Sequence, residues 1–146
     1  MRDFQRSKCY QWESDTLWYS KFNWGCDTLQ ECHTFIEKIW LKEHRKFFTK
    51  DRPVPRLGDG RGRRSAVSLG GEIRLPRFAR TGVLMCHEVA HELTPGDAHT
   101  EDWVSTHLYL LHTNLNIPMK QLVSTIEAYK IKYNQSMLRG LHDNTF

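Results

Sequence analysis

"TGVLMCHEVAHELTPGDAHTEDW", residues 81–103, contains the clearest secondary-structure signals of this chain. Thr81 is a good N-cap residue, and apolar residues follow it at helical spacing. Pro95 and Gly96 disfavour continuation of a helix, so the first helix is expected to end before them. A second helix is expected to begin near Thr100. The stretch therefore predicts two helices joined by a tight turn.

The first of these helices contains an H-E-x-x-H motif, His87 to His91. Residues four apart in a helix lie about 40° apart around the axis and roughly 6 Å along it. Two imidazoles at that separation can converge on one zinc ion, and Glu88 can take a proton from metal-bound water. Cys86, beside the motif, is assigned to the apolar core face. The alternative is a metal-free helix whose two histidines only line a polar groove.

A catalytic zinc site needs a third protein ligand in addition to this pair. His99, eight residues after His91, is the preferred candidate, because the Pro-Gly turn can return it toward the pair and imidazole is the commoner ligand. Asp97, six residues after His91, remains the alternative. The other acids and histidines in this part of the chain are assigned to helix caps, solvated faces or the core: Glu101, Asp102, His107 and Glu127.

The segments on either side of this stretch are also expected to contain helices. A first helix is expected from Asp3, as its N-cap, to about Trp18. A second is expected after Asp27, with Gln30 at the capping-box position. The last helix is expected to start at Pro118 and to run through residue 134, with a frayed tail at residues 139–146.

Short β-type runs lie between the second helix and the motif helix. "SAVSL", residues 65–69, and "EIRL", residues 72–75, are separated by Gly70-Gly71. Two glycines between such runs favour a two-residue hairpin, since both central positions of a type I′ turn need positive φ. Pro76 cannot donate to a strand ladder and should end the second strand. The fold class expected is α+β, mostly helical, with a small antiparallel sheet or hairpin packed beside the motif helix.

Composition narrows the class of protein. The chain has 146 residues, 39% of them hydrophobic, and a net charge of +4, which is too mild to imply nucleic acid by itself. No apolar run reaches the roughly 18–20 residues that a membrane span requires. The four cysteines form no C-x-x-C pair and are expected to be reduced core residues. Because the N-terminal segment has no apolar signal-peptide region, the protein is expected in the cytoplasm.

Arginines are concentrated in the middle of the chain. They are Arg52, Arg56, Arg61, Arg63, Arg64, Arg74, Arg77 and Arg80. One interpretation is a phosphate-binding surface that makes weak nucleic-acid contact, and the other is a solvated loop whose charges balance acids elsewhere. The Gly-rich "GDGRGRR" has neither a P-loop lysine nor the Rossmann spacing, so a nucleotide site of those types is not expected.

The H-E-x-x-H motif, the short loop, and then a histidine followed by an acid and an aromatic together resemble the SprT-like zinc metallopeptidases. Most of the chain is similar to a family of small H-E-x-x-H metallohydrolases of actinobacteria and their phages, through "RDFQRSKCYQWE", "GDGRGRRSAV" and "IRLPRFART". The resemblance implies a zincin-like single domain over residues 1–146, in the cytoplasm of a bacterial host if phage-encoded. In the SprT-like enzymes the second helix opens with a signature of the type H-G-P-E-F. Here His99 matches the histidine of that signature, and Thr100 to Trp103 replace its other four residues.

The function expected is therefore a zinc-dependent hydrolase, and the preferred type is a metallopeptidase that acts on a peptide or protein. His87, His91 and His99 would hold Zn²⁺, and Glu88 would activate the zinc-bound water as general base. In zincins an extended substrate pairs with a sheet edge, and the resemblance assigns that edge to the Ser65–Leu75 hairpin. The alternative is a basic DNA- or partner-binding protein with a structural or vestigial zinc site.

Overall fold

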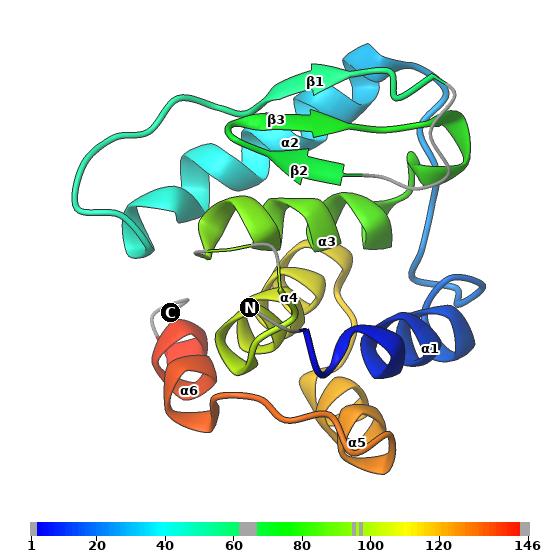
Figure 1. Ribbon diagram of the computed structural model, residues 1–146, viewed down its shortest axis with the longest axis vertical. Helices are drawn as coiled ribbons and strands as arrows, with labels where there is room; N and C mark the ends of the chain where they lie inside the picture. Colours follow the sequence, from blue (N-terminus) through cyan, green and yellow to red (C-terminus); the bar gives the residue numbers. More distant parts are fainter. Residues whose placement is uncertain (1–2, 62–66, 95, 97, 144–146) are drawn as a thin grey trace. The chain divides into compact units, whose positions relative to one another are not determined.

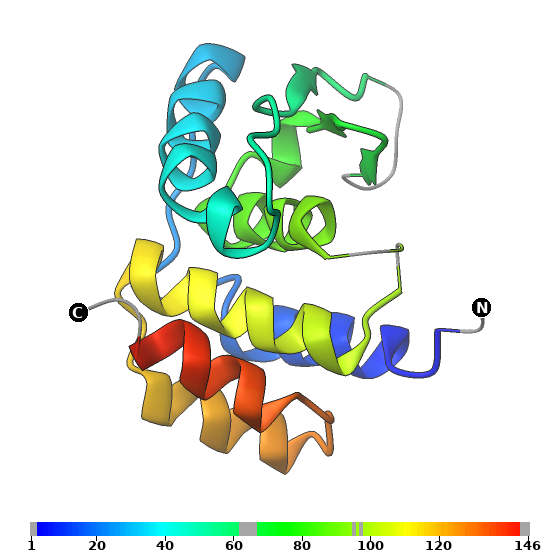
Figure 2. The ribbon, with the colours of Figure 1, turned by 90° about the vertical axis from the view of Figure 1, so that its left-hand side faces the viewer.

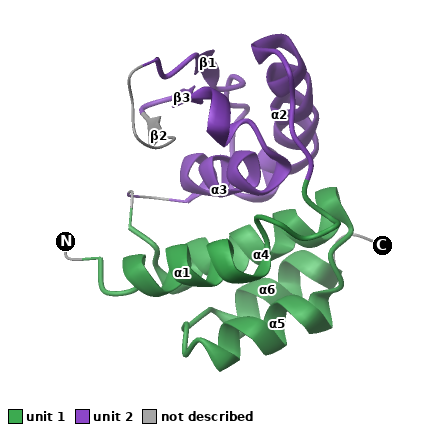
Figure 3. Ribbon diagram, turned by 90° about the vertical axis from the view of Figure 1, so that its right-hand side faces the viewer, with its two compact units in different colours: residues 1–23, 98–146 green, residues 24–97 purple. Residues whose placement is uncertain are grey.

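The computed structural model describes residues 3–61, 67–94, 96 and 98–143. The chain forms two compact units, coloured separately in Figure 3. Unit 1 combines the two ends of the chain, residues 1–23 and 98–146, and unit 2 comprises residues 24–97. The single domain expected over residues 1–146 remains a prediction.

Unit 2 contains the motif helix, α3, together with one other α-helix and a small sheet (Figure 1). Its elements in chain order are α2 (Leu29–Glu43), the short 3-10 helix η1 (His44–Lys46), β1 (Arg56–Gly58), β2 (Val67–Leu69), β3 (Glu72–Arg74), the 3-10 helix η2 (Arg77–Ala79) and α3 (Gly82–Leu93). Helix α3 contacts both α2 and β2. Its core face consists of fully buried apolar residues, Val83, Met85, Cys86, Val89 and Ala90.

The sheet of unit 2 has the strand order β1-β3-β2. Strands β2 and β3 form the expected antiparallel hairpin, with Leu69 opposite Glu72 and positive φ at both Gly70 and Gly71. The expectation of a purely antiparallel sheet was wrong, because β1 pairs with the other edge of β3 in parallel register, Leu57 opposite Ile73. This strand has only three residues and follows a proline-containing segment, so its sequence carries no alternating pattern.

The N-cap of α2 lies one residue later than the sequence predicted. Thr28, and not Asp27, adopts the extended cap conformation, and its hydroxyl accepts a hydrogen bond from the Glu31 backbone N–H. The capping contacts are therefore made by Thr28 and Glu31 instead of Asp27 and Gln30, and the Glu31 carboxylate also accepts from the Thr28 hydroxyl at 3.3 Å. Both threonine and aspartate suit an N-cap, and in an Asp-Thr pair local preference does not decide between them.

The described residues of unit 1 form four helices, which lie along one another in Figure 2. They are α1 (Arg6–Thr16), α4 (Glu101–Leu115), α5 (Met119–Ala128) and α6 (Gln135–Asp143). Helix α4 contacts α5 and α6, and α1 contacts α5. The indole of Trp12 on α1 is buried and donates to the Thr125 hydroxyl on α5 at 2.9 Å.

The C-terminal region corrects two expectations. The predicted last helix is interrupted after Ala128, where Lys130 has a φ of 58°, and a separate helix, α6, replaces the expected frayed tail. Leu138 and Leu141 of α6 are buried. Asn134 precedes the helix, and its side-chain oxygen accepts from the Met137 N–H as an N-cap. The overall class is α+β and mostly helical, as expected.

Two findings concern the cysteines and the membrane. All four cysteines lie among the described residues, and none forms a disulfide. Within the described parts of the chain, no helix combines the length and the apolar character that crossing a bilayer requires.

Candidate metal centre

Helix α3 holds the H-E-x-x-H residues in regular helical geometry. Thr81 is its N-cap, as predicted, and the Thr81 hydroxyl accepts from the Leu84 N–H at 3.3 Å. The backbone just before the helix is held as well, because Gly82 donates to the Trp24 carbonyl at 2.8 Å. One face of α3 packs in the core of unit 2, and this fixes the direction in which the remaining side chains point.

His87 and His91 lie one turn apart on α3, and their rings are close. The ring centroids are 5.1 Å apart with an interplanar angle of 59°. Each ring offers a nitrogen within 4.8 Å of a nitrogen of the other ring. Nitrogens that share one tetrahedral zinc lie about 3.3 Å apart, so small side-chain rotations bring the pair into ligand geometry. The donor set of α3 therefore fits a divalent metal that prefers imidazole.

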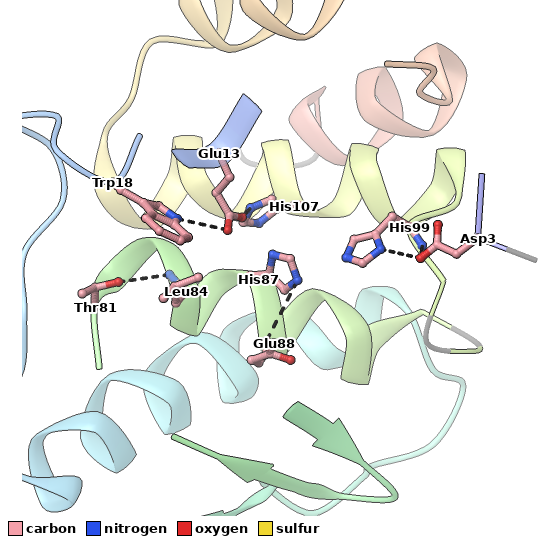
Figure 4. Close-up of polar contacts among 9 residues, drawn as sticks. All are labelled: Asp3, Glu13, Trp18, Thr81, Leu84, His87, Glu88, His99 and His107. Atoms are coloured by element: carbon pink, nitrogen blue, oxygen red, sulfur yellow. Dashed lines mark hydrogen bonds and ion pairs between the residues drawn. The ribbon is translucent and has the colours of Figure 1, made fainter. Parts of the chain in front are cut away.

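Glu88 lies beside the histidine pair and is almost fully buried. Its Oε2 is 4.0 Å from the Nε2 of His87, as the dashed line in Figure 4 marks, and the residue is 4% exposed. A buried carboxylate next to imidazole nitrogens is suited to accept and release a proton at a reacting group. The structure thus brings His87, Glu88 and His91 together, as the motif predicted.

His99 belongs to unit 1, where it comes just before α4, and a carboxylate holds its ring. The Asp3 Oδ2 accepts from His99 at two points, at 2.7 Å from the ring Nδ1 and at 3.2 Å from the backbone N–H (Figure 4). Tyr10 and Trp103 pack edge-on against the imidazole, with centroids 5.3 and 4.5 Å away. With Nδ1 bound to Asp3, the atom that this ring offers to a metal is Nε2.

The remaining candidates have structural roles or lie outside the described residues. Asp97, the alternative ligand, lies outside them. Glu101 and Asp102 are exposed in the first turn of α4, whose N-cap is Thr100, as predicted. Glu127 is exposed on α5, and its carboxylate accepts from the Tyr133 hydroxyl at 3.3 Å.

His107 is buried in the core of unit 1, and a core position was one of the two placements expected for it. Its Nε2 lies 2.9 Å from Oε2 of Glu13, and both side chains are 1% exposed. The Trp18 indole donates to the other oxygen of Glu13 at 3.3 Å (Figure 4). A carboxylate and an imidazole buried together are stabilised by such hydrogen bonds, which offset part of the cost of removing them from water.

The sequence did not predict the two carboxylates that hold these histidines. Asp3 was expected to cap α1, but the cap position is Gln5, which makes no side-chain cap bond, and Asp3 binds His99 instead. Glu13 carries no local signal beyond its place on the predicted first helix. The partners are 96 and 94 residues away in the chain, respectively, and only the fold of unit 1 reveals these contacts.

A pocket of about 440 Å³ in unit 1 opens beside His99. Its lining mixes an aromatic ring with charged groups: Asp3, Phe4, Gln5, Lys8, Ala98, His99, Thr100, Glu101 and Lys132. Phe4 is 79% exposed, and the Gln5 amide nitrogen donates to the carbonyl of His99 at 3.1 Å. The pocket has space for a side chain or chain end of a ligand next to the His99 imidazole.

Helix α3 of unit 2 offers two imidazoles and a buried carboxylate, and unit 1 offers the imidazole of His99, which Asp3 holds. That donor set fits zinc, and the buried carboxylate fits a general base. A search of protein-family models, of curated proteins and of solved structures finds no match to this chain.

Proposed function

We propose that the protein is a zinc-dependent hydrolase, with a peptide or protein as its substrate. The observation that carries the proposal is the arrangement on α3, where two imidazoles one turn apart flank a buried glutamate. A helix that only lines a polar groove has no need of a carboxylate buried beside paired histidines, because burying a charge costs free energy.

His87, His91 and His99 would hold the metal in this proposal. The Asp3–His99 hydrogen bond supports the choice of His99, since ligating histidines usually donate their second ring nitrogen to a carboxylate or carbonyl. Three imidazoles leave one position open in a tetrahedral site, as catalysis requires. When bound there, zinc supplies Lewis-acid polarisation of a substrate carbonyl and lowers the pKa of water that it coordinates.

Glu88 would act as the general base. Its carboxylate would take a proton from the attacking water and pass it to the leaving amine, so that the same group serves both halves of the reaction. Burial at 4% exposure keeps bulk water from competing for that proton. The core face of α3 holds the helix in place and so positions Glu88 with respect to the two histidines.

The sheet of unit 2 supports an extended peptide as the substrate. β2 is an edge strand, with β3 as its neighbour in the sheet, and it contacts α3. An extended chain can add to such an edge through backbone hydrogen bonds, which recognise a peptide irrespective of its sequence. A peptide on β2 would therefore run next to the helix that carries Glu88.

Substitution of Glu88 by glutamine tests the proposal directly. In zinc-loaded protein incubated with an unstructured protein such as casein, Glu88→Gln should lose at least about a hundredfold in cleavage rate while keeping its zinc. Glu37→Gln, on α2 and away from the motif, removes the same charge and should leave the rate unchanged. Equal rates for Glu88→Gln and wild type would refute the proposed role of Glu88.

A further inference from the structure

Besides the pocket beside His99 in unit 1, a pocket of about 480 Å³ lies in unit 2. None of the residues that line it belongs to the proposed metal centre. Its lining brings together the Asp59–Arg61 turn, the start of α2 and the η2 segment: Leu29, Asp59, Arg61, Pro76, Arg77 and Arg80. Three guanidinium groups and one carboxylate therefore surround a space large enough for a small organic molecule.

Arg80 is held rigidly at this pocket. Its Nε donates to the Leu75 carbonyl at 3.0 Å, and its own backbone carbonyl accepts from Cys26 at 2.8 Å. The next residue, Thr81, pairs with Gly25 in an isolated β-bridge and caps α3. A guanidinium fixed in this way loses little side-chain entropy on binding an anion, because its orientation is already set.

The opposite rim is also fixed by backbone geometry. Asp59 accepts a hydrogen bond from the Arg61 N–H at 2.8 Å and closes a tight turn. Gly60, between them, has a φ of 61°, and a Cβ at this position would lie 2.7 Å from Pro76. Only glycine permits this close packing of the turn against Pro76, so the turn that carries Arg61 is held against the wall of the pocket.

The charges of the pocket are not balanced within it. Asp59 lies 4.0 Å from the guanidinium of Arg61, and no hydrogen bond or ion pair engages the guanidinium of Arg77 in the part of the chain that the structure describes. The neighbouring sheet differs, because Glu72 there pairs with both Arg56 and Arg74 and its pKa is lowered by these guanidinium groups. The pocket thus carries the larger excess of positive charge, with three arginines against one aspartate, whereas the sheet group has two arginines against one glutamate.

We propose that this pocket binds the phosphate group of a small organic phosphomonoester. The planar forks of arginine match phosphate oxygens in bidentate geometry, and three of them can balance a dianion. Leu29 and Pro76 give the wall an apolar side for the organic part of the ligand. The volume lies in the range of small-molecule sites and exceeds what a bare phosphate ion fills. This inference does not depend on the hydrolase proposed above.

Titration calorimetry with phenyl phosphate, inorganic phosphate and a single-stranded DNA oligonucleotide tests the proposal. Phenyl phosphate should bind with one site per chain and more tightly than inorganic phosphate. Arg77→Gln should weaken that binding by about ten- to a hundredfold, because charged hydrogen bonds are lost. Arg139→Gln, an exposed arginine of α6 with the same change of charge, should leave it unchanged.

Two further variants separate the outcomes. His87→Ala should keep phenyl phosphate binding, which distinguishes this pocket from a phosphate held at the metal centre. Arg80→Lys keeps the charge but loses the fork, so it should weaken binding and leave the melting temperature close to wild type. Absence of saturable binding, unchanged binding in Arg77→Gln, or binding of the oligonucleotide alone would overturn the proposal, the last in favour of a nucleic-acid surface.

Discussion

The pairing of Asp3 with His99 is the most informative contact at the scale of single residues. It joins the beginning of the chain to a histidine 96 residues later and uses the ring Nδ1, at 2.7 Å. Aromatic contacts from Tyr10 and Trp103 add to the hold on the imidazole. A histidine restrained in this way is prepared for one direction of approach, through Nε2, which is the arrangement that a metal ligand needs.

Asp3→Asn should therefore lower zinc affinity about ten- to a hundredfold, because the amide orients the imidazole less firmly and makes it less basic. Competition with a coloured chelator measures this affinity. Asp143→Asn, an exposed position of α6, serves as the matched change and should bind zinc like wild type. Equal affinities for Asp3→Asn and wild type would exclude a supporting role of Asp3.

The cysteines illustrate how burial sets reactivity. Burial raises the pKa of Cys9 to about 12, and the carboxylates of Glu13 and Asp3 add to the effect. Burial likewise raises the pKa of Cys32 to about 12, with a smaller contribution from a hydrogen bond to the Cys26 thiol. At pH 8 such a thiol is ionised to about one part in ten thousand. Only the thiolate reacts rapidly with electrophiles.

In the folded protein at pH 8, iodoacetamide should therefore modify Cys26, the most accessible of the four, before Cys9 or Cys32. All four should react quickly in denaturant, where burial no longer raises the pKa. Peptide mass spectrometry after timed quenching gives the order. Rapid modification of Cys9 or Cys32 in folded protein would show that their surroundings are more open than described.

At the scale of elements, α3 depends on its N-terminal cap. The Thr81 hydroxyl is the side-chain acceptor at this end of the helix, and Thr81 also forms the isolated bridge with Gly25 through its backbone. Loss of the hydroxyl leaves a helix N–H without its acceptor and retains the bridge. The contribution of the cap can thus be separated from that of the backbone pairing.

Thr81→Ala should lower the free energy of unfolding by about 1 kcal/mol, whereas Thr81→Ser, which keeps the hydroxyl, should stay within about 0.5 kcal/mol of wild type. Urea titration at fixed temperature measures both variants. An alanine variant as stable as wild type would mean that the cap bond contributes nothing to folding.

Local sequence rules predicted helices α1 to α5 and missed α6. The caps of α3 and α4 are single threonines that precede apolar residues at helical spacing. Thr81 was predicted as the cap of α3, and α4 was predicted to begin near Thr100. Helix α6 was missed because only Leu138 and Leu141 supply its buried face. Its cap, Asn134, is a local signal that could have identified it. Strand β1 has three residues, which are too few to show the alternation of apolar and polar residues that identifies a strand.

At the scale of the whole molecule, the candidate site divides into a local part and a distant part. His87, Glu88 and His91 follow from helical spacing alone, so the sequence predicted their proximity. The supports of His99 come from residues near the start of the chain, and no spacing rule connects positions 3 and 99. Of the proposed ligands, His87 and His91 belong to unit 2 and His99 belongs to unit 1.

Elemental analysis of purified protein tests the central claim, that three histidines hold one zinc. Wild type should contain about one zinc per chain, and His91→Ala and His99→Ala should each lose most of it, since a catalytic zinc site is held by three protein ligands. Asp97→Ala should retain the metal. Wild-type protein without stoichiometric zinc after exposure to the metal, or full zinc content in both histidine variants, would contradict the claim.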